Sequence, residues 1–471
     1  MPARAAEDTD LTTLRSLLSA DEIITPESPE YSESSKTWAS QKQCHPRLVV
    51  RPTSVESLSK TIAHLYSTKL DFAIYGHGFM SVSAKDVLVN ISCFDEFHLD
   101  SSSTLATVGA GQTWEQVYHK LEKEAPEYGI VGARTPSVGV GGTILNGGWS
   151  WLSGEFGCIS DPINFLDAQV VKYDGSVVWA SSEPDLLWAL RGGGGGFGVL
   201  VSAVLRVFPY PRDIWTGAIL VPSEHLEQVA EGVSNMAAHE TDPKVTMFLY
   251  VLKKKVLQSI APDAKSDMMV IHAFDANGKA HGRESFKWAL DIPGAIDQTK
   301  MSTLAGVADL QSSVASVKGT IAQFWAPFVL QDITKETVMK SVNWVQGLEK
   351  IDQALAESTY LIFEVFCTRD PPGPISEVAW PRPRGSKHIL LFGPGCPAAE
   401  AQEKAALARK LAIEVPTAVL GSEEDVHILP NGADEYHDPR KIWGTHFEKL
   451  QAVRKRYDPQ CRFRAPIECK E

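Results

Sequence analysis

The feature of this chain that most directly indicates ligand binding is a set of glycine clusters. The longest spans residues 137–148 and holds five glycines in twelve positions. A helix loses about 1 kcal/mol for each glycine relative to alanine, and a strand gains no packing from one. We therefore expect a loop here, with bare N–H groups that face a phosphate-bearing ligand. Two further clusters, at residues 76–78 and 192–198, offer the same kind of backbone.

The motifs of the common nucleotide-binding and hydrolytic proteins are absent from the sequence. The sequence has no GxxxxGK(S/T) motif, which argues against a P-loop. It also has no GxGxxG that opens a helix with an acidic residue about 20 positions later, which argues against a Rossmann fold. Neither GxSxG nor HExxH occurs, and the seven cysteines include no CxxC pair, so we expect no metal site. A diphosphate held by several separate glycine turns is the ligand that remains.

Charge and composition exclude several classes of partner. The 471 residues carry a formal net charge of −13, which argues against nucleic acid, and the basic run at residues 253–255 is short. No apolar run approaches the roughly 20 residues of a membrane span. The first residues lack the apolar block of a secretory signal, so we expect a cytoplasmic protein without a membrane partner. The sequence does not indicate an oligomeric state.

The glycine clusters follow elements that can position them. Residues 47–50 and 72–75 read as strands, and between them Thr53 and Glu56 form a capping-box pattern ahead of an amphipathic helix. This β-α-β unit delivers the chain into the first glycine turn. Further along, Asp174-Gly175 predicts a hairpin between strands at residues 165–170 and 176–180.

The pattern changes after residue 215. A helix at residues 184–190 and a buried strand at 199–208 precede the change, and Pro209 ends that strand. From residue 216 to about 424 the glycine clusters disappear, and strand-like runs alternate with long helices. This order predicts an α+β fold with an antiparallel sheet that helices cover on one face.

Taken together and in order, these features resemble the FAD-linked oxidases of the vanillyl-alcohol oxidase type, in particular the berberine-bridge-enzyme-like branch with its many fungal members. The resemblance covers about residues 44–211 and 431–463. Its markers are Val49-Val50-Arg51-Pro52, Tyr75-Gly76-His77-Gly78, residues 136–148, Asp174-Gly175-Ser176, residues 185–194, and Tyr457-Asp458-Pro459 with Phe463.

The resemblance implies a division of the chain. Residues 1–40 would be an N-terminal extension and 41–215 a PCMH-type FAD-binding domain of two subdomains. Residues 216–424 would be an inserted α+β substrate domain, and 425–471 would complete the FAD domain. The first turn and residues 137–148 would hold the diphosphate, with the flavin ring facing the inserted domain.

The family's contacts, carried onto this sequence, give a set of candidate FAD-binding residues. They are Tyr75, Gly76, His77, Gly78, Phe79, Met80, Thr135, Ser137, Val138, Gly139, Gly141, Gly142, Asn146, Trp149, Gly198, Val199 and Asn431.

Two positions depart from the family pattern in a way that concerns the cofactor. Family members often tether the flavin to a histidine and a cysteine, but this chain has Phe79 and Thr135 at the matching positions. Tyr75 also replaces the usual arginine. We therefore expect FAD to be bound without a covalent bond, with His77 as the competing anchor.

The resemblance implies a base on the substrate domain or near the tail, because hydride loss from an alcohol, phenol or amine requires proton removal. Glu364 stands alone in the apolar run 361–366, although strand alternation could equally turn it to solvent. Tyr436 follows Asn431-Gly432-Ala433-Asp434, which is similar to the family's Asn-Tyr-Ala-Asp.

Other residues are weaker candidates for the same chemistry. Arg134 could place a cation by the flavin and stabilise its reduced, anionic form, or could form a plain surface salt bridge. Glu377 and His446 are weaker still. Aromatic residues in the inserted region, such as Phe248 and Tyr250, could line an apolar pocket or simply belong to the core.

The leading interpretation is an FAD-dependent oxidase of a small, apolar, natural-product-type molecule, with O2 as electron acceptor and H2O2 as product. Secondary-metabolite biosynthesis is the setting that the resemblance implies. The alternative is a non-redox cyclase or isomerase that uses FAD as a scaffold. A flavin-free binding protein would leave three glycine clusters without a ligand.

Overall fold

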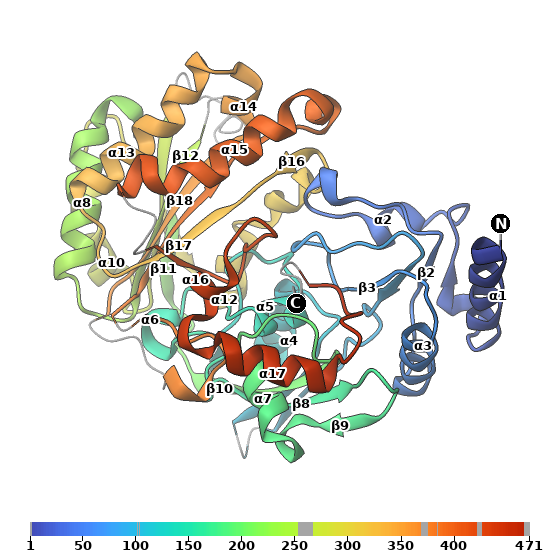
Figure 1. The fold of residues 1–471 in the computed structure, drawn as a ribbon. Helices are drawn as coiled ribbons and strands as arrows, with labels where there is room; N and C mark the ends of the chain where they lie inside the picture. The colour runs from blue at the N-terminus through green and yellow to red at the C-terminus, as the bar shows by residue number, and fades with distance from the viewer. Residues whose placement is uncertain are drawn as a thin grey trace.

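The computed structural model describes residues 2–465 except 101, 103, 253–266, 369–374, 384 and 422–425. The basic run at 253–255 lies outside these residues. Figure 1 shows a two-part molecule, with the early, blue and teal elements on one side and a large sheet with its helices on the other. Below, the early part is called the two-sheet region and the later part the large-sheet region.

The first sheet of the two-sheet region has four strands. Its strands are β1 (Ile23–Ile24), β2 (Leu48–Val50), β3 (Phe72–Tyr75) and β4 (Val87–Asn90), in the order β1-β2-β4-β3. β2 and β3 both run parallel to β4, and helix α3 (Val55–Ser67) forms the crossover between them. The predicted β-α-β unit is therefore present.

The cap of α3 is shifted from the predicted position. The N-cap is Ser54, whose hydroxyl accepts a hydrogen bond from the Ser57 N–H at 3.1 Å. Thr53 is not free for this role because its N–H and hydroxyl both donate to Glu22 Oε1, at 2.7 and 3.0 Å. The expected pair of Thr53 and Glu56 was wrong by one residue.

The second sheet of the two-sheet region has six strands. They are β5 (Phe97–Asp100), β6 (Leu105–Gly109), β10 (Val199–Pro209), β8 (Phe165–Val171) and β9 (Val177–Trp179), with β7 (Tyr128–Ile130) paired to β10. The hairpin of β8 and β9 turns at Asp174-Gly175 as predicted, and Gly175 has φ +83°. Helix α7 (Pro184–Leu190) occupies the predicted residues.

The large-sheet region is built on a sheet with nine strands in the described part of the chain. Neighbouring strands pair antiparallel, as the sequence predicted. They are β11 (Ile214–Pro222), β12 (Val245–Leu252), β13 (Met268–Asp275), β14 (Ile296–Asp297), β15 (Lys300–Ser302), β17 (Ala326–Leu330), β18 (Tyr360–Phe366), β19 (His388–Gly393) and β21 (His427–Ile428). A separate pair is formed by β16 (Ile321–Gln323) and β20 (Gly395–Pro397).

Long helices cover one face of this sheet (Figure 1). They are α8 (Leu226–His239), α13 (Lys335–Gly347) and α15 (Ala401–Leu420). α15 stops at Gly421, which has φ +79°. The α+β class with a helix-covered antiparallel sheet is confirmed.

Alternation along the strands gives the sheet two different faces. On β12 and β18, Met247 and Phe363 pack in the core beneath the helices, whereas Phe248 and Phe366 pack with residues of the two-sheet region. Successive side chains of a strand point to opposite faces, so one strand serves both cores. The inner face of the large sheet is therefore the surface that meets the two-sheet region.

The end of the chain returns to the two-sheet region. Helices α16 (Pro439–Trp443) and α17 (Phe447–Tyr457) follow the large sheet, and α17 packs against α7. Beyond α17, the Tyr66 hydroxyl donates to Asp458 Oδ1 at 2.9 Å. The tail thus closes onto α3.

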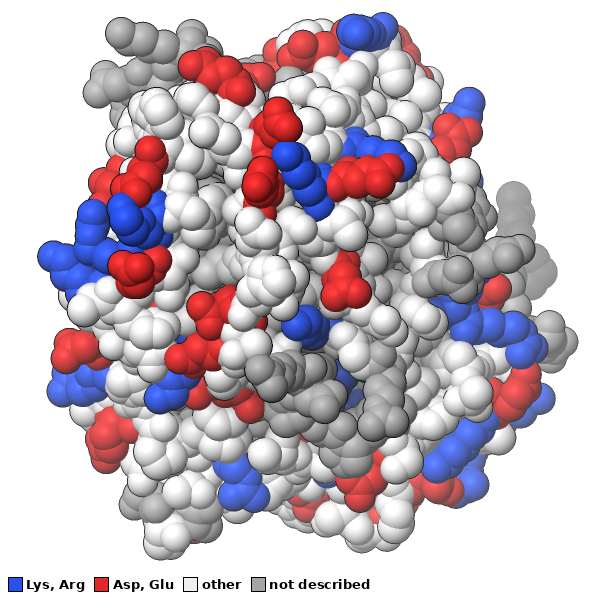
Figure 2. Space-filling model, turned by 90° about the vertical axis from the view of Figure 1, so that its left-hand side faces the viewer, with Lys and Arg blue, Asp and Glu red and all other residues white. Residues whose placement is uncertain are grey.

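Two surface properties bear on possible partners. Figure 2 shows acidic and basic side chains intermingled over one face of the molecule, without a large patch of one sign. Among the helices that the structure describes, none combines the length and the apolar character needed to cross a bilayer.

Candidate functional site

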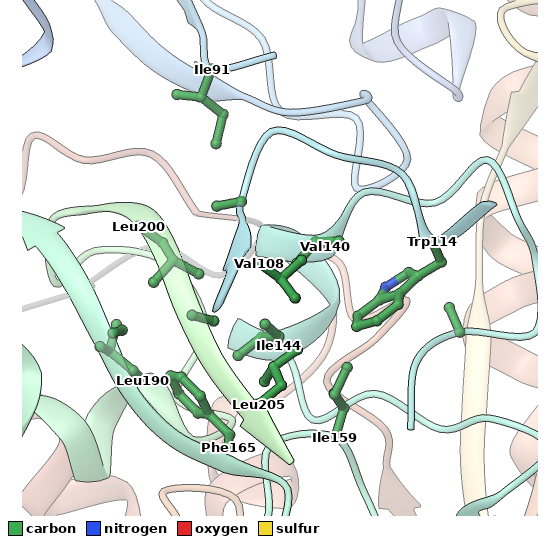
Figure 3. Close-up of a cluster of buried hydrophobic side chains, with 14 of the residues drawn as sticks. Ile91, Val108, Trp114, Val140, Ile144, Ile159, Phe165, Leu190, Leu200 and Leu205 are labelled. Atoms are coloured by element: carbon green, nitrogen blue, oxygen red, sulfur yellow. The ribbon is translucent and has the colours of Figure 1, made fainter. Parts of the chain in front are cut away.

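The central glycine cluster is partly helical, which corrects the expectation of a loop. Helix α5 (Val140–Leu145) runs through it. Val140 and Ile144 lie one turn apart and are fully buried against β6 and β10, as Figure 3 shows. Their burial offsets the poor helix propensity of Gly141 and Gly142. The loop prediction counted glycines and missed this apolar stripe.

The glycines of α5 leave one side of the helix bare. Gly142 is exposed, and a Cβ there would meet no atom within 4 Å. Gly141 lies close to the preceding loop, where a Cβ would come within 3.3 Å of the Ala110 carbonyl oxygen. The helix therefore packs with one side and presents open backbone on the other.

The start of α5 lies against the first glycine turn. A Cβ at Gly139 would lie 3.0 Å from Cδ2 of His77, and His77 Nε2 lies 2.8 Å from the carbonyl oxygen of Gly111. Burial lowers the pKa of His77, so its ring is neutral at pH 7 and holds the turn through this one contact. Two glycine clusters distant in sequence thus form one surface.

The end of α5 meets the third cluster and the tail. Gly194 N–H donates to the Leu145 carbonyl at 2.8 Å, and Asn146 Nδ2 donates to the Gly142 carbonyl at 2.8 Å. Asn431 Oδ1 accepts from Gly148 N–H at 2.7 Å. All three glycine clusters are therefore joined through α5.

These residues fit a phosphate-bearing cofactor. The Ser137 hydroxyl is buried and has no partner among the described residues, and it precedes α5 by three positions. Gly76 and Gly142 both face space that a Cβ would enter without meeting another atom. An unpaired hydroxyl between two open stretches of backbone provides the donors that a diphosphate requires.

The remaining candidate cofactor residues have varied surroundings. Trp149 packs against Phe366 of the large sheet with ring centroids 5.0 Å apart, and its indole N–H has no partner among the described residues. Met80 and Val138 are half-buried. Gly198 has φ +117° and packs on Val171, just before β10 begins at Val199.

Phe79 and Thr135, which stand where the family has its tethering residues, both contact neighbouring side chains. The Phe79 ring stacks on Trp38 with centroids 4.6 Å apart. The Thr135 hydroxyl lies 3.5 Å from Nη1 of Arg134 and accepts its hydrogen bond. Neither side chain offers a nucleophile of the kind that forms the family's tethers.

A buried ion pair joins the two regions of the molecule. Arg134 Nε donates to Glu364 Oε1 at 2.6 Å, and the two side chains are 17% and 6% exposed. Arg134 directly precedes Thr135, and Glu364 lies on β18. Strand alternation turned Glu364 toward the two-sheet region, so it faces neither solvent nor the helices.

Glu364 belongs to a polar row on the inner face of the sheet. In register, His272 on β13 pairs with Phe248 on β12, and Phe248 pairs with Glu364. Tyr250 stands one position along the same face, with its hydroxyl 3.4 Å from Arg134 Nη1. Polar side chains on a buried face are costly unless they are paired or bind something.

Gln311 completes this polar group. Its Nε2 donates to the Tyr250 hydroxyl at 2.9 Å and lies 3.2 Å from His272 Nδ1. Burial lowers the pKa of His272 to about 3, so the ring is neutral and carries its proton on Nε2 when Nδ1 accepts from Gln311. Within the described residues, His272 Nε2 and Gln311 Oε1 have no hydrogen-bond partner.

The other catalytic candidates lie elsewhere. The Tyr436 hydroxyl donates to the Trp325 carbonyl at 2.7 Å and accepts from the Trp325 N–H at 2.8 Å, so its one proton is already engaged. This geometry favours a structural role. His446 lies near Trp188, its Nδ1 3.0 Å from the Val378 carbonyl, and Glu377 ends a short 3-10 turn.

His272 and Gln311 were absent from the sequence predictions. His272 sits in the apolar strand 268–275 and could have been found by the same argument that singled out Glu364, a lone polar residue in a buried strand. Gln311 lies in a short loop after α12 (Leu304–Asp309) and has no local pattern that marks it.

The comparisons with known proteins agree with this geometry. Residues 46–181 match the FAD binding domain family FAD_binding_4. An FAD-dependent monooxygenase of Cochliobolus heterostrophus is 30% identical over 349 residues, which is 69% of this chain and 64% of that protein. The match therefore spans slightly less than two thirds of that relative's length.

Solved structures share the fold over nearly the whole chain. 6-Hydroxy-D-nicotine oxidase from Arthrobacter nicotinovorans superposes with a TM-score of 0.77 at 19% identity, covering 95% of this chain and 97% of the other. Berberine bridge enzyme gives a TM-score of 0.79 at 16% identity, covering 98% of both chains. At these identities the likeness concerns the fold.

Proposed function

This chain belongs to the FAD-linked oxidoreductases, and on that premise we propose that it oxidises a small, largely apolar organic molecule with a noncovalently held FAD. The observation that carries the proposal is the buried pair of Arg134 and Glu364. It lies between the FAD binding domain and the inner face of the large sheet. A carboxylate held there is placed to take a proton from a substrate between the two regions.

FAD, when bound, supplies the acceptor for a hydride and passes the electron pair to O2, which leaves as H2O2. The residues of the chain that would hold it are those joined by α5, including Ser137, Gly139, Gly142 and the turn at Gly76. Neutral His77 keeps that turn in place.

In the proposed reaction Glu364 acts as the general base. The substrate loses a C–H hydride and one proton from O–H or N–H, and Glu364 accepts that proton. Arg134 fixes the orientation of the carboxylate through the 2.6 Å contact. Proton transfer to a positioned side chain contributes about 10²–10⁴-fold to such reactions.

The surroundings of the pair favour an apolar substrate with one polar group. Phe248 and Phe366 on the inner face of the sheet form an aromatic wall, against which Trp151 of the two-sheet region packs. His272 Nε2–H and Gln311 Oε1 provide a donor and an acceptor without partners in the described residues. A hydroxyl can satisfy both, so we propose an alcohol or phenol as the substrate class.

Relatives support an oxidation. Two relatives found by sequence are named FAD-dependent monooxygenase and (R)-6-hydroxynicotine oxidase. Both names state an oxidation, which supports a redox role for this chain.

An anaerobic mixing experiment tests the proposal. Candidate alcohols and phenols are added to the FAD-loaded protein without O2, and the oxidised flavin band is followed. Bleaching supports oxidation, and its return on admission of air supports O2 as acceptor. Product without bleaching would instead identify the non-redox cyclase or isomerase.

Acid precipitation tests how the flavin is held. Because Phe79 and Thr135 stand at the tether positions, we expect the yellow colour to remain in the supernatant. Colour in the pellet would contradict the noncovalent proposal, and a His77→Ala variant would then show whether His77 is the anchor.

A further inference from the structure

A segment before β2 connects the first glycine turn to the large-sheet region. Trp38 N–H donates to the Gly78 carbonyl at 2.9 Å, and the Trp38 carbonyl accepts from Gly319 N–H at 2.9 Å. One residue later, Ala39 forms a parallel bridge with Ile321 at the start of β16. The loop at residues 318–320 is thereby held beside the turn.

That loop brings Lys318 to the turn. Lys318 Nζ donates to the Tyr75 hydroxyl at 3.1 Å, and the Tyr75 hydroxyl donates to the Lys36 carbonyl at 2.8 Å. Tyr75 is the last residue of β3 and directly precedes Gly76. The ammonium group therefore sits at the entrance to the glycine turn, although it comes from a distant part of the chain.

The charge of Lys318 is only partly compensated. Its side chain is 13% exposed, and its nearest carboxylate, Glu33, is 3.8 Å away and 80% exposed. Burial lowers the pKa of Lys318, which reflects the cost of holding a cation in this environment. Among the described residues, Lys318 has one carboxylate partner, and that side chain is exposed to solvent. A largely buried cation paired in this way is costly unless an anion binds beside it.

We propose that Lys318 supplies the positive charge that binds the diphosphate of FAD at the first glycine turn. The inference rests on FAD binding and not on the proposed oxidation. The diphosphate is the anionic part of the cofactor, and open Gly76 and Lys318 both lie at this turn. Unpaired Ser137 stands two residues before Gly139, which packs on His77 of the turn. Lys318 also lies close enough to His77 for its charge to lower the pKa of that ring.

The assignment explains why the turn functions with tyrosine at position 75. The family pattern carries an arginine there, and in this chain the hydroxyl of Tyr75 orients a lysine from another segment. Lys318 would thus bind the cofactor from the large-sheet side. FAD binding and the docking of the 318–320 loop then stabilise each other.

Binding titrations with two flavins test the role of Lys318. The variants are Lys318→Met, Lys318→Gln and Lys318→Arg, and the probes are FAD and riboflavin, which has no phosphate. We expect Lys318→Met and Lys318→Gln to weaken FAD binding about 10-fold or more, because a charge-assisted contact is lost. The affinity for riboflavin should change by less than about 3-fold, which is within the spread of the contribution of a single hydrogen bond.

Controls separate charge from structure. Lys318→Arg keeps the charge and should keep FAD affinity, and Lys318→Gln keeps a hydrogen bond to Tyr75 should Lys318→Met fail to fold. Lys335→Met removes a surface lysine that pairs with Glu227 and should leave both affinities unchanged. Equal loss of FAD and riboflavin binding, or unchanged FAD binding in Lys318→Met and Lys318→Gln, would overturn the proposal.

These outcomes do not depend on turnover. A protein that binds FAD through Lys318 but bleaches with no alcohol or phenol would retain this inference and lose the proposed oxidation. If the protein oxidises its substrate and Lys318→Met binds FAD with normal affinity, the proposed oxidation is retained and the role of Lys318 is lost.

Discussion

The two faces of the large sheet are made by the same strands and differ in what they bury. On β18, Phe363 and Val365 pack in the apolar core beneath the helices, whereas Glu364 points to the two-sheet region and meets Arg134. On β13, Ile271 and Ala273 belong to the helix-covered core, and His272 between them joins the polar group.

This difference separates stability from chemistry within single strands. Most side chains of the outer face belong to an apolar core that can be packed for density. The inner face holds charged and neutral polar groups that are stable only with partners. Substitutions one residue apart should therefore affect different properties of the protein, and the following predictions test that separation.

The largest effect is expected from Glu364→Gln. The amide keeps the shape and an acceptor for Arg134 but cannot take a proton, so kcat should fall about 10²–10⁴-fold with FAD still bound. Steady-state kinetics with flavin absorbance would measure this. Glu155→Gln, which alters a half-buried carboxylate bonded to Tyr210, is the matched control and should keep wild-type kcat. Wild-type turnover in Glu364→Gln would remove this residue from the mechanism.

Arg134→Met should cost about 3–5 kcal/mol of unfolding free energy, because it leaves the Glu364 carboxylate buried without its partner. Urea denaturation would measure the loss. The double variant with Glu364→Gln should recover part of it, since no unpaired charge is then buried. A double variant as unstable as Arg134→Met alone would show that the pair contributes through packing and not through charge.

Phe363→Ala should cost a similar amount, about 3–5 kcal/mol, by opening a cavity in the outer core. Phe363 is fully buried, and the aromatic ring contributes no group to the inner face. The folded fraction of this variant should keep kcat within about 3-fold. A large change in kcat would show that the two faces are mechanically coupled and that stability and chemistry are not separated.

The smallest effect is expected on the pH dependence of stability, and it comes from two buried histidines. Burial lowers the pKa of His272 and of His388 to about 3, against an ordinary value of 6.5. Between these values the unfolded chain binds more protons, so stability rises with pH there. As pH falls through this window, each histidine should cost about 1.4 kcal/mol per pH unit.

Variants distinguish the two positions. His272→Asn and His388→Asn should each reduce the slope of stability against pH by one proton. Only His272→Asn should also raise KM, because His388 lies at the start of β19 away from the polar group. Equal effects on KM would contradict the assignment of a substrate contact to the inner face.

Local patterns predicted much of this fold. The turn at Asp174-Gly175 and the helix from Pro184 depend on a few neighbouring residues, and both were found where expected. The cap at Ser54 was missed because Thr53 is engaged by Glu22, 31 positions away. Nothing near Thr53 in sequence reports that competition.

The candidate site was predicted in part for the same reason. Glu364 stood out as a lone charge in an apolar strand, and the structure places it on the inner face with Arg134. α5 was missed because glycine content outweighed the stripe of Val140 and Ile144. Lys318 and Gln311 carry no local pattern, since their roles depend on loops that only the complete fold brings into place.

The contact of Tyr66 with Asp458 has a consequence for biosynthesis. The two residues are 392 positions apart, and their hydrogen bond is 2.9 Å long. At translation rates of about 5–20 residues per second, α3 waits roughly 20–80 seconds for the tail that covers it. The large-sheet region emerges completely during that interval and can pack its outer core first. The tail can therefore close onto α3 only after the whole large-sheet region has been synthesised.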